Sequence, residues 1–303
     1  MTRDLSYLFW IIITIVIGTF LYFTLCSDCQ LVSTDTEPVE EETVTIEAPE
    51  PTSFPFAFGD GAYGYNVGEN FNFNVASGAF ITPVSLNINK GIDGLKSFLT
   101  ENTGKSINIT GLYKSDEDNN TAWPNLGLAR ANSVKNYLVG LGIPAAQTNT
   151  FGKLMDDMVP SENILLGPVT YAFADRSENA EDELKALYDR IKANPLVLYF
   201  NTGEAAINLS AEQRQKIADI ARYLDKVGDA SCSIVGHTDN TGSRDTNVRL
   251  GQERADFAKA YLIRNGIQEG KIATSSEGPD IPIASNDTEE GRSKNRRTVV
   301  TLN

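Results

Sequence analysis

The chain has 303 residues, a formal net charge of −14 and a hydrophobic content of 41%. This length allows two ordinary domains with additional segments, and the hydrophobic content suffices for folded cores, so a fully disordered chain is excluded. The negative charge argues against a nucleic-acid partner, because affinity for a phosphate backbone comes largely from Lys and Arg.

The first predicted element is an apolar run at residues 5–26 that contains no charged residue. The run is long enough to cross a bilayer as one helix, and no small-x-small cleavage site follows it. We therefore expect an uncleaved transmembrane helix within an anchor segment at residues 1–32. Arg3 precedes the run and the next basic residue is Lys90, so the positive-inside rule places the bulk of the chain across the membrane.

The three cysteines fall into two groups. Cys26 and Cys29 form a Cys-x-x-Cys pair at the outer end of the apolar run, where a bridge to each other or to a neighbouring chain is possible in an oxidising compartment. Cys232 lies in a predicted strand and is expected to be a small core residue.

Residues 33–66 are predicted to be an acidic linker rich in Pro and Thr. The segment contains few large apolar side chains, so burial cannot offset the entropy cost of ordering it. We expect it to be extended.

Two stretches of the chain repeat each other. Residues 126–143 and 250–267 are identical at nine of eighteen positions at an offset of 124, and Ile109–Gly111 matches Ile234–Gly236 at an offset of 125. This repeat predicts two tandem copies of one domain, at residues 67–176 and 195–303. The segment between them, 177–194, is predicted to be a connecting helix, since Leu184, Leu187, Tyr188 and Ile191 share one helical face.

The second copy has the clearer pattern of elements. Strands are predicted at residues 195–200, 232–235, 272–274 and 297–302, and helices after the capping box Ser210-x-x-Gln213 and at 248–264 before Asn265-Gly266. This β-α-β-α-β-β order predicts an α+β fold in which helices cover one side of a mixed sheet, and we expect the same sandwich in both copies.

Asp239 and Arg254 are the principal candidate site residues. A strand that ends near Gly236 delivers Asp239 to a loop, and a helix that begins near Asn247 places Arg254 about two turns in, facing that loop. A carboxylate and a guanidinium in this arrangement suit a zwitterion, the head group of an amino acid. The alternative interpretation of this spacing is a structural ion pair.

Several separated motifs of the second copy occur in a specific order: Gly236-His-Thr-Asp-Asn-Thr-Gly242, Asn247, Leu250-x-x-x-Arg254-Ala255, Asn265-Gly266-Ile267, Pro282 and Gly291-Arg-Ser-Lys-Asn-Arg-Arg297. Over residues 195–303 the chain closely resembles the C-terminal peptidoglycan-binding domain of the OmpA family. The resemblance implies that Asp239 meets the ammonium group of the diaminopimelate residue in the stem peptide and that Arg254 meets its carboxylate. Thr238 and Asn247 stand where the family has supporting polar contacts, and Asn201 stands where it often has Asp.

The function implied by the resemblance is non-enzymatic and non-covalent binding of peptidoglycan, which would tether a membrane-anchored protein of the bacterial cell envelope to the wall from the periplasm. We predict no catalytic residue, no cofactor and no metal site; His237 is the single histidine, and no paired carboxylates suggest a wall hydrolase. The alternative function is a scaffold or stator-type subunit of an envelope machine.

The first copy departs from the pattern. It keeps Arg130, but Lys114 stands at the position of Asp239, and the Gly-Arg-x-x-Asn-Arg-Arg segment is missing. Two cations should repel the ammonium of the ligand, so we expect a degenerate domain that acts as a spacer, a homodimer surface or a platform for an envelope protein partner. A more anionic ligand is the alternative. The basic cluster Arg292, Lys294, Arg296 and Arg297 is interpreted either as a solvated helix end or as a contact for peptide carboxylates.

Overall fold

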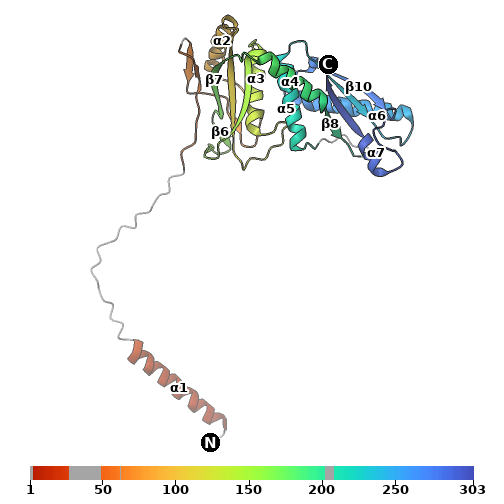
Figure 1. The fold of residues 1–303 in the computed structure, drawn as a ribbon. Helices are drawn as coiled ribbons and strands as arrows, with labels where there is room; N and C mark the ends of the chain where they lie inside the picture. Colours follow the sequence, from red (N-terminus) through yellow and green to blue (C-terminus); the bar gives the residue numbers. More distant parts are fainter. Residues whose placement is uncertain (1–2, 27–48, 62, 202–207) are drawn as a thin grey trace. The chain divides into compact units, whose positions relative to one another are not determined.

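The computed structural model describes residues 3–26, 49–61, 63–201 and 208–303, and it divides into two units, Met1–Ala48 and Pro49–Asn303 (Figure 1). In the first unit, helix α1 covers Arg3–Cys26, where the apolar run predicts a helix. Cys29, the side chain of Cys26 and the first part of the predicted linker, residues 33–48, lie outside the described residues.

The predicted transmembrane anchor is not supported by the structure. No helix within the described ranges is both long and apolar enough to cross a membrane.

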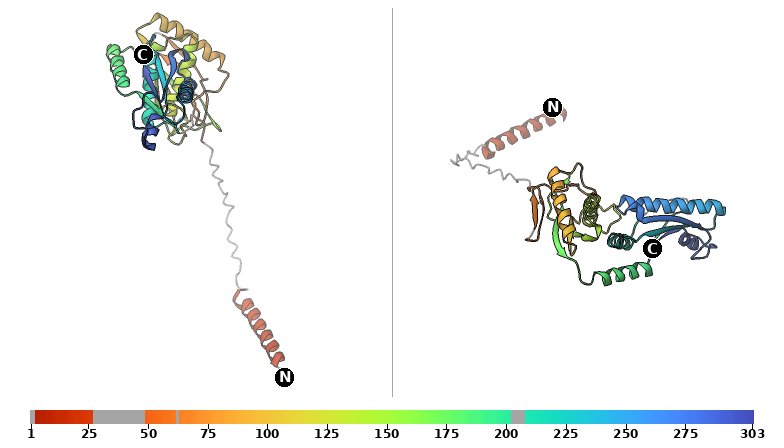
Figure 2. Two further views of the ribbon diagram at one scale, coloured as in Figure 1. Left: turned by 90° about the vertical axis from the view of Figure 1, so that its right-hand side faces the viewer. Right: turned by 90° about the horizontal axis from the view of Figure 1, so that it is seen from above.

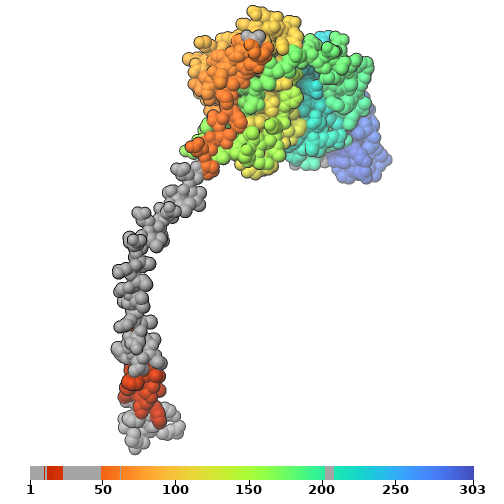
Figure 3. Space-filling model, turned by 60° about the vertical axis from the view of Figure 1, so that its left-hand side comes forward, coloured from red at the N-terminus to blue at the C-terminus, as the bar shows by residue number. Residues whose placement is uncertain are grey.

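The predicted linker is wrong in its C-terminal part, because residues 56–59 and 64–67 lie in paired strands. Strands β1 (Phe56–Gly59) and β2 (Gly64–Val67) form an antiparallel hairpin. Phe56 is fully buried and its ring lies 4.8 Å from that of Tyr171. The aromatic residues of this segment bury enough apolar surface to order it. The prediction missed this because it extended the Pro-rich, acidic composition of the upstream residues to the whole segment. Figure 3 shows the segment, in orange, against the rest of its unit.

The first lobe, residues 49–176, is built on a three-stranded sheet in the order β5-β4-β7. Strand β4 (Lys105–Tyr113) pairs in parallel with β5 (Thr148–Leu154) and antiparallel with β7 (Val169–Asp175). The helices are α2 (Leu86–Glu101) and α3 (Leu126–Gly140), and the remaining short elements are β3 (Phe73–Asn74), β6 (Ile164–Leu165) and the 3-10 helix η1 (Ala145–Gln147). Apolar side chains of both helices and of the sheet form one core.

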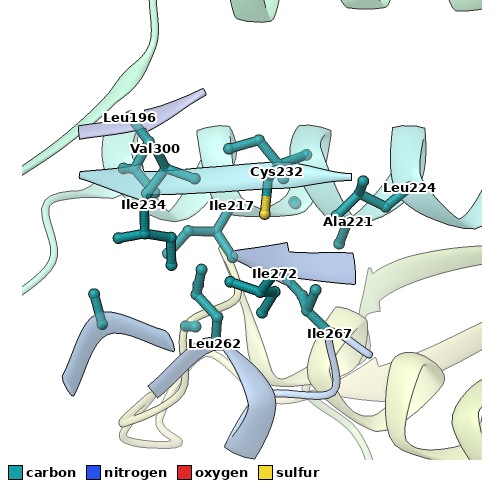
Figure 4. Packing of buried hydrophobic residues seen from close by; sticks show 14 of the residues in the cluster. Leu196, Ile217, Ala221, Leu224, Cys232, Ile234, Leu262, Ile267, Ile272 and Val300 are labelled. Atoms are coloured by element: carbon teal, nitrogen blue, oxygen red, sulfur yellow. The ribbon is translucent and has the colours of Figure 1, made fainter. Parts of the chain in front are cut away.

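The second lobe, residues 195–303, has the predicted mixed sheet, in the order β10-β9-β11-β8. Its strands are β8 (Leu196–Tyr199), β9 (Cys232–His237), β10 (Ile272–Gly278) and β11 (Arg297–Leu302), and its helices are α5 (Ala211–Lys226), α6 (Arg244–Arg264), the 3-10 helix η2 (Glu269–Lys271) and α7 (Glu289–Asn295). Side chains of α5 and α6 meet those of the sheet in the core that Figure 4 shows, where the buried Cys232 confirms its predicted place.

Local signals account for the helix ends of the second lobe. The capping box of Ser210 and Gln213 is confirmed at the start of α5. Helix α6 begins at Arg244, earlier than predicted, because the side chain of Ser243 accepts a hydrogen bond from the Thr246 amide. Helix α7 was missed, although Thr288 caps it and two acidic residues follow in its first turn.

A strand-helix-strand unit with a close glycine contact occurs in each lobe. Helix α6 joins the parallel strands β9 and β10, as α3 joins β4 and β5. A Cβ atom on Gly236 would lie 1.9 Å from the Gly251 carbonyl oxygen, and one on Gly111 would lie 2.0 Å from that of Gly127. Each helix therefore rests directly on the backbone of its strand.

Polar contacts join the two lobes, which Figure 2 shows in yellow and green and in cyan and blue. Lys135 pairs with Asp225 at 2.5 Å, and the Lys226 Nζ donates to the carbonyl oxygens of Ala146 and Thr148 and to the Asn149 side chain. Burial lowers the pKa of Lys226 to about 8. The predicted connecting helix is α4 (Ala180–Ala193), whose Leu187 and Ile191 pack in the core of the second lobe.

Replacement of Gly236 tests the contact between α6 and β9. Gly236→Ala should lower the free energy of unfolding by about 3 kcal/mol, because the new methyl group meets backbone that cannot move aside. Urea denaturation measures the change. Gly228→Ala is the matched control, since a Cβ atom there has no neighbour within 4 Å; equal losses in the two variants would contradict the prediction.

Candidate ligand-binding site

The candidate site lies at the edge of the second sheet where β8 and β9 end. Asn201 follows β8, Asp239 follows β9, and Arg254 lies on α6 about three turns after its start. Thr238, Asp239, Asn247 and Arg254 are all buried, and Asn201 is exposed. The structure thus brings the five predicted site residues to one edge of the sheet.

Arg254 is fully buried and is held by main-chain oxygens. Its Nη2 donates to the Asn201 carbonyl at 3.1 Å and its Nη1 to the His237 carbonyl at 3.5 Å, while the guanidinium lies 5.3 Å from the centre of the Phe200 ring. Burial, followed by the charge of Arg296, lowers the pKa of Arg254, and the Asp239 carboxylate acts in the opposite direction. Arg254 and Asp239 thus lie at the same edge of the sheet, since the His237 carbonyl that Arg254 contacts is two residues before Asp239.

Asp239 already has a cationic partner within the protein. Its Oδ2 accepts a hydrogen bond from the Arg296 Nη1 at 2.8 Å, and its Oδ1 accepts one from the Thr241 amide at 2.9 Å. Burial acts to raise the pKa of Asp239, but these hydrogen bonds outweigh it and keep the pKa below its ordinary value. The carboxylate therefore stays ionised at neutral pH.

Arg296 is the residue that sequence reasoning did not place. It is 7% exposed and bridges Asp239 and Glu289, to which its Nη2 donates at 2.6 Å. Arg292 and Lys294, by contrast, pair with Glu289 and Glu290 at the surface of α7. Arg292 and Lys294 of the basic cluster thus lie at the surface, and Arg296 and Arg297 are buried. Arg296 is buried because it stands between the end of α7 and the start of β11.

Thr238 and Asn247 build the loop that carries Asp239. The Thr238 hydroxyl donates to the Asp239 carbonyl at 2.8 Å, and the Asn247 side-chain amide donates to the Thr241 carbonyl at 3.1 Å. Asn201 takes part through its carbonyl, which accepts from Arg254. Direct contact of any of these side chains with a ligand stays a prediction.

Cationic side chains predominate around the site. Arg297 is buried on β11, and its Nη2 donates to the Ile281 carbonyl at 3.1 Å. Burial, with a smaller contribution from Arg297, lowers the pKa of His237 to about 4, so the imidazole is neutral at physiological pH. Such surroundings, with Asp239 as the buried carboxylate, favour an anionic or zwitterionic guest.

Some polar atoms near the site are unsatisfied within the part of the chain that the structure describes. They are His237 Nδ1, Arg296 Nε and Thr298 Oγ1, each buried without a hydrogen-bond partner. Buried polar groups are rarely left in this state, so water or a ligand is the expected partner. No group of three or more His, Cys, Asp or Glu that could hold a metal ion occurs among the described residues.

The fold and the site define a small α+β ligand-binding domain. The model of the OmpA family matches residues 199–296. Over 122 residues, which are 40% of this chain and 68% of the relative, the chain is 32% identical to the peptidoglycan-associated lipoprotein of Buchnera aphidicola. The chain therefore belongs to the OmpA family.

Other relatives match shorter parts of their own length. The chain is 41% identical to the probable lipoprotein YiaD of Escherichia coli over 86 residues, 28% of this chain and 39% of the relative. It is 36% identical to the peptidoglycan-binding protein ArfA of Mycobacterium tuberculosis over 121 residues, 40% of this chain and 36% of the relative. The chain thus spans less than two fifths of the length of these two relatives.

The comparison with solved structures gives matches to about a third of the chain. The crystal structure of the peptidoglycan-associated lipoprotein from Burkholderia pseudomallei covers 35% of this chain and 89% of its own, with 24% identity and a TM-score of 0.33.

Titration of His237 tests the burial of the site. Its pKa is about 4 in the folded chain against 6.5 in the unfolded chain, so the unfolded state takes up the proton first and stability falls as the pH drops from 6.5 to 4. His237→Gln should remove about 2 kcal/mol of this loss, measured as the difference in unfolding free energy between pH 7 and pH 4.5. Because the chain has one histidine, its imidazole NMR signal can be followed directly; a midpoint near 6.5 would contradict the prediction.

Proposed function

We propose that the second lobe binds peptidoglycan without covalent chemistry and recognises the diaminopimelate residue of its stem peptide. Relatives of this chain are named peptidoglycan-binding and peptidoglycan-associated proteins, which supports a binding role in the cell envelope and not an enzymatic one. The observation that carries the proposal is the position of Arg254, whose guanidinium contacts the His237 carbonyl two residues before Asp239 at the same edge of the sheet.

The chemistry of the ligand head group fits these two side chains. The carboxylate of diaminopimelate would accept hydrogen bonds from the Arg254 guanidinium, and its ammonium would donate to Asp239. A carboxylate has about four lone-pair positions, so Asp239 can keep Arg296 and Thr241 and still accept from an ammonium. Two or three charge-assisted hydrogen bonds of roughly 1.5–3 kcal/mol each correspond to a micromolar to millimolar dissociation constant after the costs of binding.

The first lobe is proposed to contain a degenerate copy of the same domain, with the copies at residues 67–176 and 195–303, the connecting segment at 177–194, and the β1-β2 hairpin preceding the first copy. The order of strand, helix and parallel strand in both lobes supports this proposal, as do the two equivalent glycine contacts. In this arrangement the second lobe holds the wall and the first lobe serves as a platform joined to it by Lys135 and Lys226.

Sedimentation of the full chain with purified peptidoglycan tests the proposed site. Asp239→Asn keeps the size of the side chain and removes its charge, so it should weaken binding at least about tenfold through the loss of the charge-assisted hydrogen bond to the ammonium. Asp245→Asn is the matched control, because Asp245 is an exposed acid in the first turn of α6.

The experiment separates binding from folding. Denaturant unfolding of Asp239→Asn checks that the second lobe remains folded after its ion pair with Arg296 is broken. A folded Asp239→Asn chain that sediments as well as the wild type would refute the site. Competition by free diaminopimelate, but not by 1,5-diaminopentane, which has the same chain and ammonium groups without the carboxylates, would identify the head group that is recognised.

A further inference from the structure

Each lobe buries one arginine at the same position of the repeat, and main-chain carbonyls accept its hydrogen bonds. Arg130 on α3 is fully buried and donates from Nε to the Ser77 carbonyl at 3.0 Å and from Nη1 to the Leu112 carbonyl at 2.7 Å. Arg254 on α6 donates to the carbonyls of Asn201 and His237.

One pair of acceptors is also equivalent in sequence. Leu112 and His237 are 125 positions apart, which is the offset of the repeat upstream of each helix. Each guanidinium therefore reaches from its helix to the end of the equivalent strand, Arg130 to β4 and Arg254 to β9.

The first lobe differs in having an internal carboxylate at this place. Both oxygens of Glu117 accept from Arg130, Oε2 from Nη1 at 3.0 Å and Oε1 from Nη2. The amide of Ala76 donates to Oε1 and that of Lys114 to Oε2, each at 2.9 Å, and the Glu117 side chain is 1% exposed. A bidentate guanidinium and two main-chain amides are the donors expected around a bound carboxylate.

The charge of Glu117 is kept in spite of its burial. Burial acts to raise its pKa, but the hydrogen bonds from Arg130, Lys114 and Ala76 outweigh this and lower it. In the second lobe the positions equivalent to Glu117, at offsets of 124 and 125, are Thr241 and Gly242, neither of which is an acid.

We infer that the first lobe retains a carboxylate-binding site at Arg130 and that Glu117 occupies it as an internal substitute for a ligand carboxylate. The comparison with the second lobe rests on the proposed function of Arg254. The site takes no diaminopimelate while Glu117 is in place, because the Glu117 carboxylate already accepts from both Nη atoms of the Arg130 guanidinium.

The prediction that two unpaired cations make the first lobe degenerate is wrong. The sequence suggested two uncompensated cations, Lys114 and Arg130, but Glu117 neutralises Arg130 and Lys114 pairs with Asp116 at 3.3 Å near the surface. Loss of binding in the first lobe therefore comes from occupation of the carboxylate position as well as from the exchange of Asp for Lys.

Chemical rescue with acetate tests the assignment in the full chain. Glu117→Ala leaves Arg130 and two amides around a cavity, so the melting temperature of the chain should fall. Sodium acetate, at ten times the dissociation constant of acetate for this cavity, should raise the melting temperature by about 3 °C. Sodium chloride at equal ionic strength is the salt control. The wild type and the double variant Glu117→Ala, Arg130→Met should show no specific effect of acetate, and an acetate effect equal to that of chloride in Glu117→Ala would overturn the inference.

A second measurement does not depend on the folding of the Glu117 variant. In the Asp239→Asn chain, where the second lobe is disabled, free diaminopimelate should leave the NMR signals of the Ala76 and Lys114 amides unchanged; saturable shifts there would overturn the inference. The two proposals can fail separately. Acetate rescue together with normal sedimentation of Asp239→Asn would refute the wall-binding site and support the assignment of Glu117. Loss of sedimentation without acetate rescue would refute the assignment of Glu117 and support the wall-binding site.

Discussion

A fully buried guanidinium between strand ends and a helix is the constraint on which both lobes depend. Arg130 and Arg254 each have main-chain carbonyls as acceptors, and a buried charge without such acceptors would be strongly destabilising. The carbonyls in turn fix how strand ends and helix meet, and the glycine contacts set their spacing. In the first lobe Glu117 neutralises the guanidinium of Arg130, whereas in the second lobe the guanidinium of Arg254 lies near the ion pair of Asp239 and Arg296.

Periodic patterns predicted the architecture of the second lobe well because its strands and helices each bury one face. The strand Arg297–Leu302, the capping box at Ser210 and the core place of Cys232 follow from such local signals. The hairpin at Phe56–Val67 was missed, since its order comes from distant partners such as Tyr171. Composition of the neighbouring segment carries no information about those partners.

The residues of the candidate site were found from charge and motif, but their pairing was not. Sequence placed Asp239 and Arg254 at one edge of the sheet, whereas Arg296 and Glu117 depend on which loop folds over which helix end. Both are ion pairs between residues at least 13 positions apart, and their partners are chosen by tertiary packing. A charge pattern therefore predicts the position of a site better than it predicts which residues of the chain pair with its charged groups.

The position of β8 has a mechanical consequence. The chain enters this edge strand at Leu196 from the connecting helix and leaves it next to Arg254. If Arg254 holds a wall ligand as proposed, tension between the connecting helix and that ligand would run parallel to the strand axis. The four residue pairs that join β8 to β11 then resist sliding together, and none is peeled away before the others.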